Sequence, residues 1–146
     1  MLTALFNHWK NSTEAIKDVQ GLVWALSMEP LPPAIYNHAA PGSNSLGISG
    51  TRKDSLVVSL LAARWSLITD DDLVTNTATT LINNIKTDAQ RLGQYDKFQY
   101  LNYAAPSQTP ILNYGAESVA RLRKVSAKYD PLGVFQKQVP GGFKLP

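Results

Sequence analysis

The chain contains no cysteine among its 146 residues, and this absence excludes several kinds of chemistry at once. Disulfides, thiolate metal ligands, a cysteine nucleophile and any cofactor attached through cysteine are all ruled out. Only two histidines are present, His8 and His38, and their spacing is not that of a metal-binding pair. The acidic run Asp70–Asp72 is more typical of a helix start than of a cation site. We therefore expect no metal.

Charged residues and long apolar runs are also scarce. Charged side chains make up 17% of the chain and apolar ones 44%, which favours a folded protein with a buried interface or pocket. Residues 1–20 place Asn7, His8, Lys10 and Glu14 between their apolar positions, so they match neither a signal peptide nor a membrane span. From this we expect a cytoplasmic protein that does not associate with membranes.

The formal net charge of +3 is too small to indicate a nucleic-acid-binding protein. Much of the excess lies between Arg121 and Lys144, where six basic residues face one aspartate. Nucleic-acid binding usually rests on a continuous basic stripe combined with aromatic side chains or with an element that enters a groove. We therefore expect no nucleic-acid partner.

The length of the chain and its first apolar segments indicate one domain over residues 1–146. Apolar residues near helical spacing predict an amphipathic helix over residues 2–18. The run from Gly21 to Leu31 predicts a buried strand that ends before Pro30, with Trp24 in the core or lining a pocket. Thus a helix is expected to precede the first strand.

The next segment predicts a turn, a loop and a second strand. Pro33 is placed to begin a short helical turn through Tyr36, because proline is accepted in the first turn of a helix. The stretch Pro41–Gly47, continuing to Arg52 and Lys53, is rich in residues typical of loops. A β-branched run between Asp54 and Trp65 then predicts a strand covered on both faces.

A long helix is the clearest element of the chain. Thr69 is placed to cap its start, and Gly93 stands where a left-handed terminating residue is preferred. Its apolar residues form one continuous stripe, which predicts the face that packs on the rest of the domain: Leu73, Val74, Ala78, Leu81, Ile82, Ile85, Ala89 and Leu92.

Two more elements complete the predicted fold. Alternating aromatics predict a strand over Phe98–Tyr103. A last helix is expected from Ala116 to Tyr129, packing Val119, Leu122, Val125 and Tyr129, with Asp130-Pro131 ending it. The order of elements predicts an α+β fold, with a small antiparallel or mixed sheet of three or four strands and helices packed on one face.

The most specific motifs lie in the last third of the chain, as Tyr100-Leu-Asn-Tyr103, Tyr114-Gly115, Arg121–Val125 and Lys128-Tyr-Asp-Pro-Leu-Gly-Val-Phe135. This string resembles the C-terminal segment of berberine-bridge-enzyme-like FAD-linked oxidases. Weaker similarity to fungal members extends upstream through Glu29-Pro-Leu-Pro32, Gly42, Asn44–Gly47, Trp65 and Asp70–Asp72. The resemblance implies a substrate domain of secondary metabolism whose last elements approach the flavin.

The resemblance also implies candidate site residues. Tyr103 matches a tyrosine that can act as the catalytic base in the family, with Tyr100 and Asn102 as its neighbours toward substrate and cofactor. An unperturbed phenol has a pKa near 10, so the residue chemistry itself favours a hydrogen-bond donor over a base. A glutamate that some relatives carry falls near Val58, and apolar pocket walls with one basic residue are expected on the same face. The substrate-binding candidates are therefore Tyr100, Asn102, Val58, Leu60, Arg64, Trp24 and His38.

The family's cofactor is not expected to bind this chain by itself. The sequence has no glycine-rich phosphate loop between a strand and a helix, and Gly42–Gly47 lacks that setting. We expect no cofactor, unless FAD is supplied across a dimer or by a partner.

Three functions remain open from the sequence. The leading hypothesis is a flavin-independent cyclase or isomerase that holds a small apolar metabolite in the old substrate cavity, with Tyr103 as donor. The alternatives are the C-terminal part of an FAD-dependent oxidoreductase, inactive alone or working with a separate FAD-binding chain, and a non-catalytic binding or assembly module. A homodimer is expected in each case.

Overall fold

The computed structural model describes residues 1–38, 40, 42–48 and 53–146. The chain divides into two compact units, which we call unit 1 (Met1–Met28 with Ser59–Asp96) and unit 2 (Glu29–Val58 with Lys97–Pro146). Each unit is built from two separate segments of the chain. The single domain expected over residues 1–146 stays a prediction.

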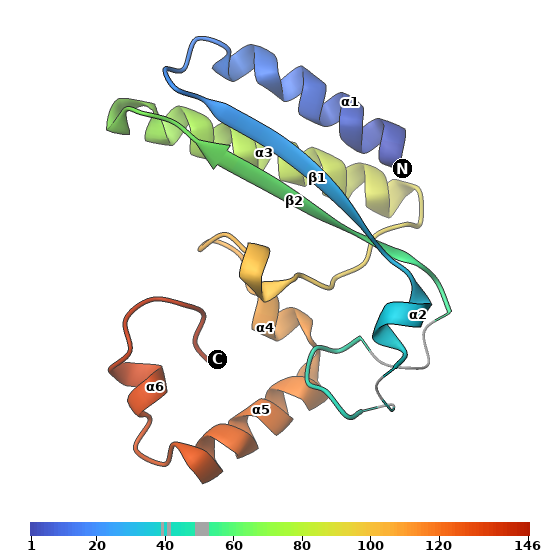
Figure 1. The fold of residues 1–146 in the computed structure, drawn as a ribbon, viewed down its shortest axis with the longest axis vertical. Helices are drawn as coiled ribbons and strands as arrows, with labels where there is room; N and C mark the ends of the chain where they lie inside the picture. The colour runs from blue at the N-terminus through green and yellow to red at the C-terminus, as the bar shows by residue number, and fades with distance from the viewer. Residues whose placement is uncertain (39, 41, 49–52) are drawn as a thin grey trace. The chain divides into compact units, whose positions relative to one another are not determined.

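The sheet consists of two antiparallel strands, β1 (Val23–Leu31) and β2 (Leu56–Arg64), which lie side by side in Figure 1. The predicted α+β class is confirmed, but the expected three or four strands are reduced to two among the described residues. The predicted end before Pro30 is also wrong, because β1 continues to Leu31. Proline is tolerated at a sheet edge, and both strands of a two-stranded sheet are edges.

Helices α1 (Leu2–Ser12) and α3 (Asp71–Arg91) cover the sheet in unit 1 (Figure 1). The predicted helix over residues 2–18 changes after Ser12 into a 3₁₀ helix, η1 (Thr13–Ile16). The hydroxyls of Ser12 and Thr13 donate to the carbonyls three residues earlier, at 2.6 and 2.7 Å. Such local hydrogen bonds compete with regular helix bonding, which explains the change.

The core of unit 1 consists of Ile16, Trp24, Val74 and Leu81. Trp24 is 9% exposed, and its indole N–H donates to the Ser12 hydroxyl at 3.0 Å. Trp65 is partly buried against this core, and its N–H donates to Asp71 at 2.6 Å. The expectation that Trp24 packs in the core is confirmed, and Trp65 packs beside it. Each tryptophan has a partner for its polar end.

Helix α3 ends as predicted and begins differently. Gly93 has a φ of +65°, and Gln94 donates to the carbonyl of Ala89 at 2.8 Å, as in a glycine-terminated helix. At the other end Asp70 is the N-cap residue and makes no side-chain capping bond, so the predicted Thr69 cap is wrong. Thr69 lies inside a preceding 3₁₀ turn, η2 (Ile68–Asp70), which delays the start of the helix. The stripe buries Val74, Leu81 and Ala89.

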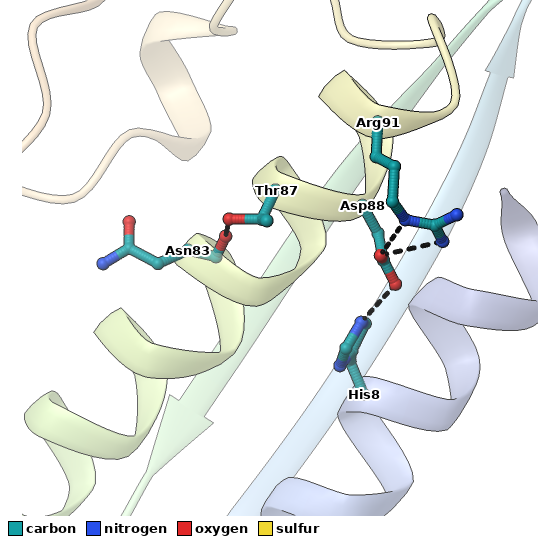
Figure 2. Close-up of polar contacts among 5 residues, drawn as sticks. All are labelled: His8, Asn83, Thr87, Asp88 and Arg91. Atoms are coloured by element: carbon teal, nitrogen blue, oxygen red, sulfur yellow. Dashed lines mark hydrogen bonds and ion pairs between the residues drawn. The ribbon is translucent and has the colours of Figure 1, made fainter.

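A polar cluster joins α1 to α3 (Figure 2). His8 Nε2 lies 2.8 Å from Asp88 Oδ2, and Arg91 donates to Asp88 Oδ1 from Nε at 3.1 Å and from Nη2 at 3.0 Å. These hydrogen bonds, from His8 first and then from Arg91, lower the pKa of the Asp88 carboxyl. Asp88 thus stays ionised and links the two helices.

Strand β2 departs from its predicted burial. Its residues alternate between half-buried and exposed over Leu56–Leu60, and none is fully buried. A strand covered on both faces is therefore wrong for the described residues. The β-branched composition identified the strand correctly, but composition does not show how many layers cover it.

Unit 2 contains short helices around one longer helix. They are α2 (Pro33–Tyr36), the 3₁₀ turn η3 (Leu101–Tyr103), α4 (Pro110–Asn113), α5 (Ala116–Tyr129) and α6 (Val134–Lys137). The predicted turn at Pro33 and the helix over residues 116–129 are confirmed. Within α5 only Val119 is buried, while Val125 is 47% and Tyr129 72% exposed, so their predicted packing is wrong.

The predicted loop falls partly outside the described residues, since Pro41 and Arg52 are not among them. Within the described part of the chain, no helix is long and apolar enough to cross a membrane. The same residues contain no group of three or more histidine and acidic side chains arranged to hold a metal ion.

Candidate functional site: an aromatic cluster with Glu29

Residues 98–103 are held against the C-terminal end of α4 by side-chain contacts. The rings of Phe98 and Tyr114 stack at 6.0 Å between centroids, and Asn113 donates to the Gln99 side chain at 2.7 Å. Burial raises the pKa of the Tyr114 phenol, which is 6% exposed. The predicted strand over Phe98–Tyr103 is wrong. Its backbone is irregular up to Tyr100 and then forms η3, so side chains rather than a sheet position this segment.

Three of the predicted site residues meet at η3. The rings of Tyr100 and Tyr103 form an edge-to-face pair with centroids 4.8 Å apart and planes at 80°. The Asn102 side-chain amide donates to the Tyr100 hydroxyl at 2.9 Å. The backbone N–H of Tyr103 donates to the carbonyl of Tyr100 at 3.0 Å, which closes the turn. The cluster is accessible, since Tyr100 is 39% and Tyr103 37% exposed.

The sequence analysis missed a fourth member of this site, Glu29 on β1. The Tyr103 hydroxyl is 3.3 Å from both carboxylate oxygens of Glu29, to which it donates. The two residues are 74 positions apart in the chain. Glu29 begins the Glu-Pro-Leu-Pro stretch that contributed to the family resemblance, and this was the available signal. Only the fold shows that its carboxylate meets Tyr103.

Glu29 further stabilises the protonated form of Tyr103. Its negative charge, followed by desolvation and the hydrogen bond to the carboxylate, raises the pKa of the Tyr103 phenol above 10. A nearby negative charge disfavours the phenolate. Tyr103 is therefore a protonated hydrogen-bond donor at neutral pH, and the arrangement opposes the role of a free phenolate base.

The other predicted site residues lie elsewhere in the two units. Val58 is half-buried and His38 exposed in unit 2, while half-buried Leu60 and exposed Arg64 belong to unit 1. Trp24 is also in unit 1, in its core. Substrate binding by these five residues stays a prediction.

Among the described residues of unit 2 we consider two open hollows, and neither is lined by the tyrosine cluster. The larger, about 360 Å³, lies at the start of α5 and is lined by Gly42, Asn44, Gly47 and residues 114–118. The smaller, about 140 Å³, is lined by residues 108–112 together with Phe143, Lys144 and Pro146. The tyrosine cluster is thus a surface rather than the wall of either hollow.

The larger hollow does not fit the pyrophosphate of FAD. Arg121 donates to the carbonyls of Gly42, Ser43 and Asn44, which fixes the loop with these backbone oxygens toward the guanidinium. Glu117 also lines the hollow, and its carboxylate would repel a phosphate. The lining of this hollow therefore does not suit a pyrophosphate, and the expected absence of a cofactor stays a prediction.

Comparison with known proteins supports the resemblance carried by the C-terminal motifs. Residues 99–139, which include η3 and α5, match the family described as "Berberine and berberine like". The chain is 37% identical over 95% of its length to the FAD-dependent monooxygenase drtC of Aspergillus calidoustus, and 38% identical over 82% to the FAD-dependent monooxygenase tpcD of Cochliobolus heterostrophus. It is also 42% identical over its whole length to oligopeptidase PhomG' of Diaporthe leptostromiformis.

These matches confirm that the chain resembles the C-terminal, berberine-like region of flavin-dependent proteins of fungal secondary metabolism. The chain spans only part of each relative: 27% of drtC, 23% of tpcD and 12% of the oligopeptidase. No solved structure matches the chain.

Proposed function

We propose that this chain forms the substrate-binding side of an FAD-dependent oxidoreductase of fungal secondary metabolism. The observation that carries the proposal is the cluster of Tyr100, Asn102 and Tyr103, which lies inside the family-matched segment and is joined to Glu29. The relatives named as FAD-dependent monooxygenases favour this function over the cofactor-free enzyme.

In this proposal the cluster binds and orients a small, largely apolar metabolite. The two tyrosine rings offer an edge and a face for an apolar body, while the polar groups beside them fix its orientation. Tyr103, the predicted catalytic residue, acts as a donor: its hydroxyl proton is transferred from the hydrogen bond with Glu29 to a hydrogen bond with a substrate oxygen.

FAD is held in this proposal by protein outside the described residues. The source is either a separate FAD-binding chain or additional sequence of the kind that the relatives carry. Tyr103 then contributes a hydrogen bond at the substrate, and Glu29 contributes a carboxylate. Neither contribution depends on flavin contacts within this chain.

The test has two parts. The purified chain is incubated with excess FAD, freed of unbound ligand and examined by visible absorption, and we expect no retained flavin band. The drtC protein without the residues that match this chain is then mixed with it, and we expect the mixture to retain flavin. The proposal assigns substrate binding to this chain and FAD binding to other protein. Failure of the mixture to retain flavin, or flavin retention by the chain alone, contradicts this assignment.

A flavin-independent cyclase or isomerase is the second candidate, and the protonation state of Tyr103 favours it. A protonated phenol serves as donor without any cofactor, and holding a reactive substrate in a folded geometry lowers the barrier further. The chain alone is incubated with metabolites from a strain that lacks its gene. Conversion to products of unchanged mass, slowed by Tyr103→Phe, supports this function, whereas unchanged metabolites contradict it.

A binding or assembly module is the third candidate, and exposed apolar side chains near the C-terminus favour it. Tyr129, Leu132 and Phe135 are 72%, 79% and 66% exposed. Large exposed apolar patches commonly mark interfaces. The expected homodimer stays a proposal that light scattering over a dilution series tests, because a monomer at every concentration contradicts it.

A further inference from the structure

We propose that the smaller hollow of unit 2 is a second ligand site, which binds a single aromatic ring that carries a hydrogen-bond acceptor such as a ketone oxygen. Two segments of the unit form this hollow, residues 108–112 and the C-terminal segment 143–146. The tyrosine cluster does not line it. The site therefore goes beyond the proposed function, and it requires neither flavin nor the substrate of the tyrosine cluster.

The walls of the hollow are largely apolar, and its size matches one ring. Pro110 and Ile111 are buried beside it, and Leu112 is 53% exposed. Phe143, which is half-buried, lines it from the C-terminal segment. An apolar cavity of about 150 Å³ is large enough to hold benzene. The hollow measures about 140 Å³ and is open, so a ring fits while its substituents extend toward solvent.

Two neutral side chains at the hollow can donate hydrogen bonds to a ligand. Gln108 Oε1 accepts from the backbone N–H of Ala105 at 2.8 Å. Because an N–H group can only donate, this contact identifies the oxygen of the Gln108 amide and leaves its NH₂ group unused. Within the described part of the chain, neither this NH₂ group nor the Thr109 hydroxyl makes a hydrogen bond.

These donors favour a neutral ligand with an acceptor oxygen. Lys144 is the one charged side chain among the described residues that line the hollow, and it already donates to the carbonyls of Phe135 at 3.1 Å and Val139 at 2.8 Å. Its aliphatic chain can therefore serve as wall while its charge is bound elsewhere. A ketone or ester oxygen accepts from the two donors without the cost of desolvating a charged ligand.

Hydrogen bonds to α5 and α6 hold the C-terminal wall of the hollow. Arg123, on α5, donates to the carbonyl of Pro146 from Nε at 2.8 Å and from Nη2. The backbone N–H of Leu145 donates to the side chain of Gln136, on α6, at 2.9 Å. The segment that carries Phe143 is thus fixed at several points, which preserves the hollow between ligand-binding events.

Two probes of equal shape test the proposal: acetophenone and α-methylstyrene, in which a CH₂ group replaces the ketone oxygen. Each is titrated into ¹⁵N-labelled chain, and the amide signals of the non-proline residues of 108–112 and 143–146 are followed by NMR. We expect acetophenone to shift signals in both segments, because both line the hollow.

Substitution of Gln108 tests the hydrogen bond. Gln108→Met keeps the length of the side chain and removes its NH₂ group. It should weaken acetophenone binding about 2- to 10-fold, the effect of about one hydrogen bond, and leave α-methylstyrene binding unchanged. Gln138→Met, at an exposed glutamine that does not line the hollow, is the matched control and should affect neither probe.

Substitution of Phe143 tests the wall. Phe143→Ala should weaken both probes about 2- to 10-fold through loss of a ring contact, with unchanged circular dichroism. Phe135→Ala, at a phenylalanine that is 66% exposed and does not line the hollow, should weaken neither.

Three results overturn the inference: no shift in either segment with acetophenone, equal effects of Gln108→Met on the two probes, or binding that is unchanged by Phe143→Ala. Because these measurements involve neither flavin nor Tyr103, such a failure is distinct from failure of the flavin-retention test.

Discussion

Distant segments of unit 1 meet in an apolar core, whereas several distant segments of unit 2 are joined by hydrogen bonds from side chains to backbone carbonyls. In unit 1, Ile16, Trp24, Val74 and Leu81 form a core, and polar bonds such as those at Asp88 join side chains of two helices. In unit 2, Tyr36 donates to the carbonyl of Asp54, and Arg121 donates to carbonyls of Gly42–Asn44. Arg123 donates to the carbonyl of Pro146, and Lys144 donates to those of Phe135 and Val139. The two units are therefore held together by different kinds of contact.

Unit 1 relies on the dense packing that stabilises folded proteins, and unit 2 presents accessible polar and aromatic groups. Tyr100, Asn102, Tyr103 and Glu29 are all in unit 2 and all exposed. The proposed binding role requires these groups to remain partly exposed, and their segment is positioned by directed bonds. Substitutions in each unit test this difference.

The largest effect is expected from Leu81→Ala in unit 1. Leu81 is 2% exposed, so its truncation leaves a cavity and should lower the free energy of unfolding by about 2–5 kcal/mol. Leu73→Ala, at a residue that is 46% exposed on the same helix, is the control and should cost much less. Urea denaturation measures both. Equal losses would show that α3 is not held by this core.

A pair of glycines tests backbone packing in unit 2. Gly47 and Gly42 have φ of +73° and +72°, so alanine costs about 1–2 kcal/mol of strain at either. At Gly47 the new Cβ would also clash with the Tyr114 carbonyl, whereas at Gly42 it meets nothing within 4 Å. Gly47→Ala should therefore cost about 1–3 kcal/mol more than Gly42→Ala in thermal unfolding. A difference of zero would contradict the packing of this loop on Tyr114.

Asp88→Asn should weaken unit 1 in a pH-dependent way. The folded-state pKa of Asp88 lies below its ordinary value of 3.8, so the ionised carboxylate stabilises the fold above about pH 4, and this contribution is lost as the pH falls through the folded pKa. The stability difference between wild type and variant should therefore shrink in acid. Asp18→Asn, at an exposed position, is the control. A difference that stays constant from pH 7 to pH 3 would exclude the ionised contact.

Glu29→Gln should change the titration of one tyrosine with little effect on stability. Removing the negative charge lowers the pKa of Tyr103 toward 10, because that charge is the main cause of its increase. Phenolate absorption is measured during an alkaline titration, and Tyr103→Phe identifies the contribution of Tyr103. Glu14→Gln, in unit 1, should leave the titration unchanged. A Tyr103 pKa unaltered by Glu29→Gln would disprove the contact.

Local sequence patterns predicted the elements whose stabilising contacts are close in the chain. The Gly93 terminus of α3, the helix over residues 116–129 and the turn at Pro33 were correct. The predicted stripe of α3 was correct except at its two ends, where Leu73 and Leu92 are exposed. Each depends on helical periodicity, glycine at positive φ or proline at a helix start, which are short-range effects. The C-terminal motifs likewise identified the family, since a motif is a local string.

These local patterns did not predict the contacts between distant segments. The aromatic alternation of residues 98–103 predicted a strand, but the segment is held by side-chain contacts with Asn113 and Tyr114. Exposure of Val125 and Tyr129 likewise depends on what lies opposite them, which helical spacing does not specify.

The sequence by itself determined the α+β class, the main helices, the resemblance to berberine-like proteins and three residues of the candidate site, because these depend on neighbours along the chain. Only the tertiary structure brought Glu29 to Tyr103 across 74 positions. That pairing directs the Tyr103 hydroxyl proton to a carboxylate and raises the pKa of the phenol further above its ordinary value. The physical reason is that the pKa of a phenol and the direction of its hydrogen bond depend on the charges within a few ångströms in space, wherever those charges lie in the sequence.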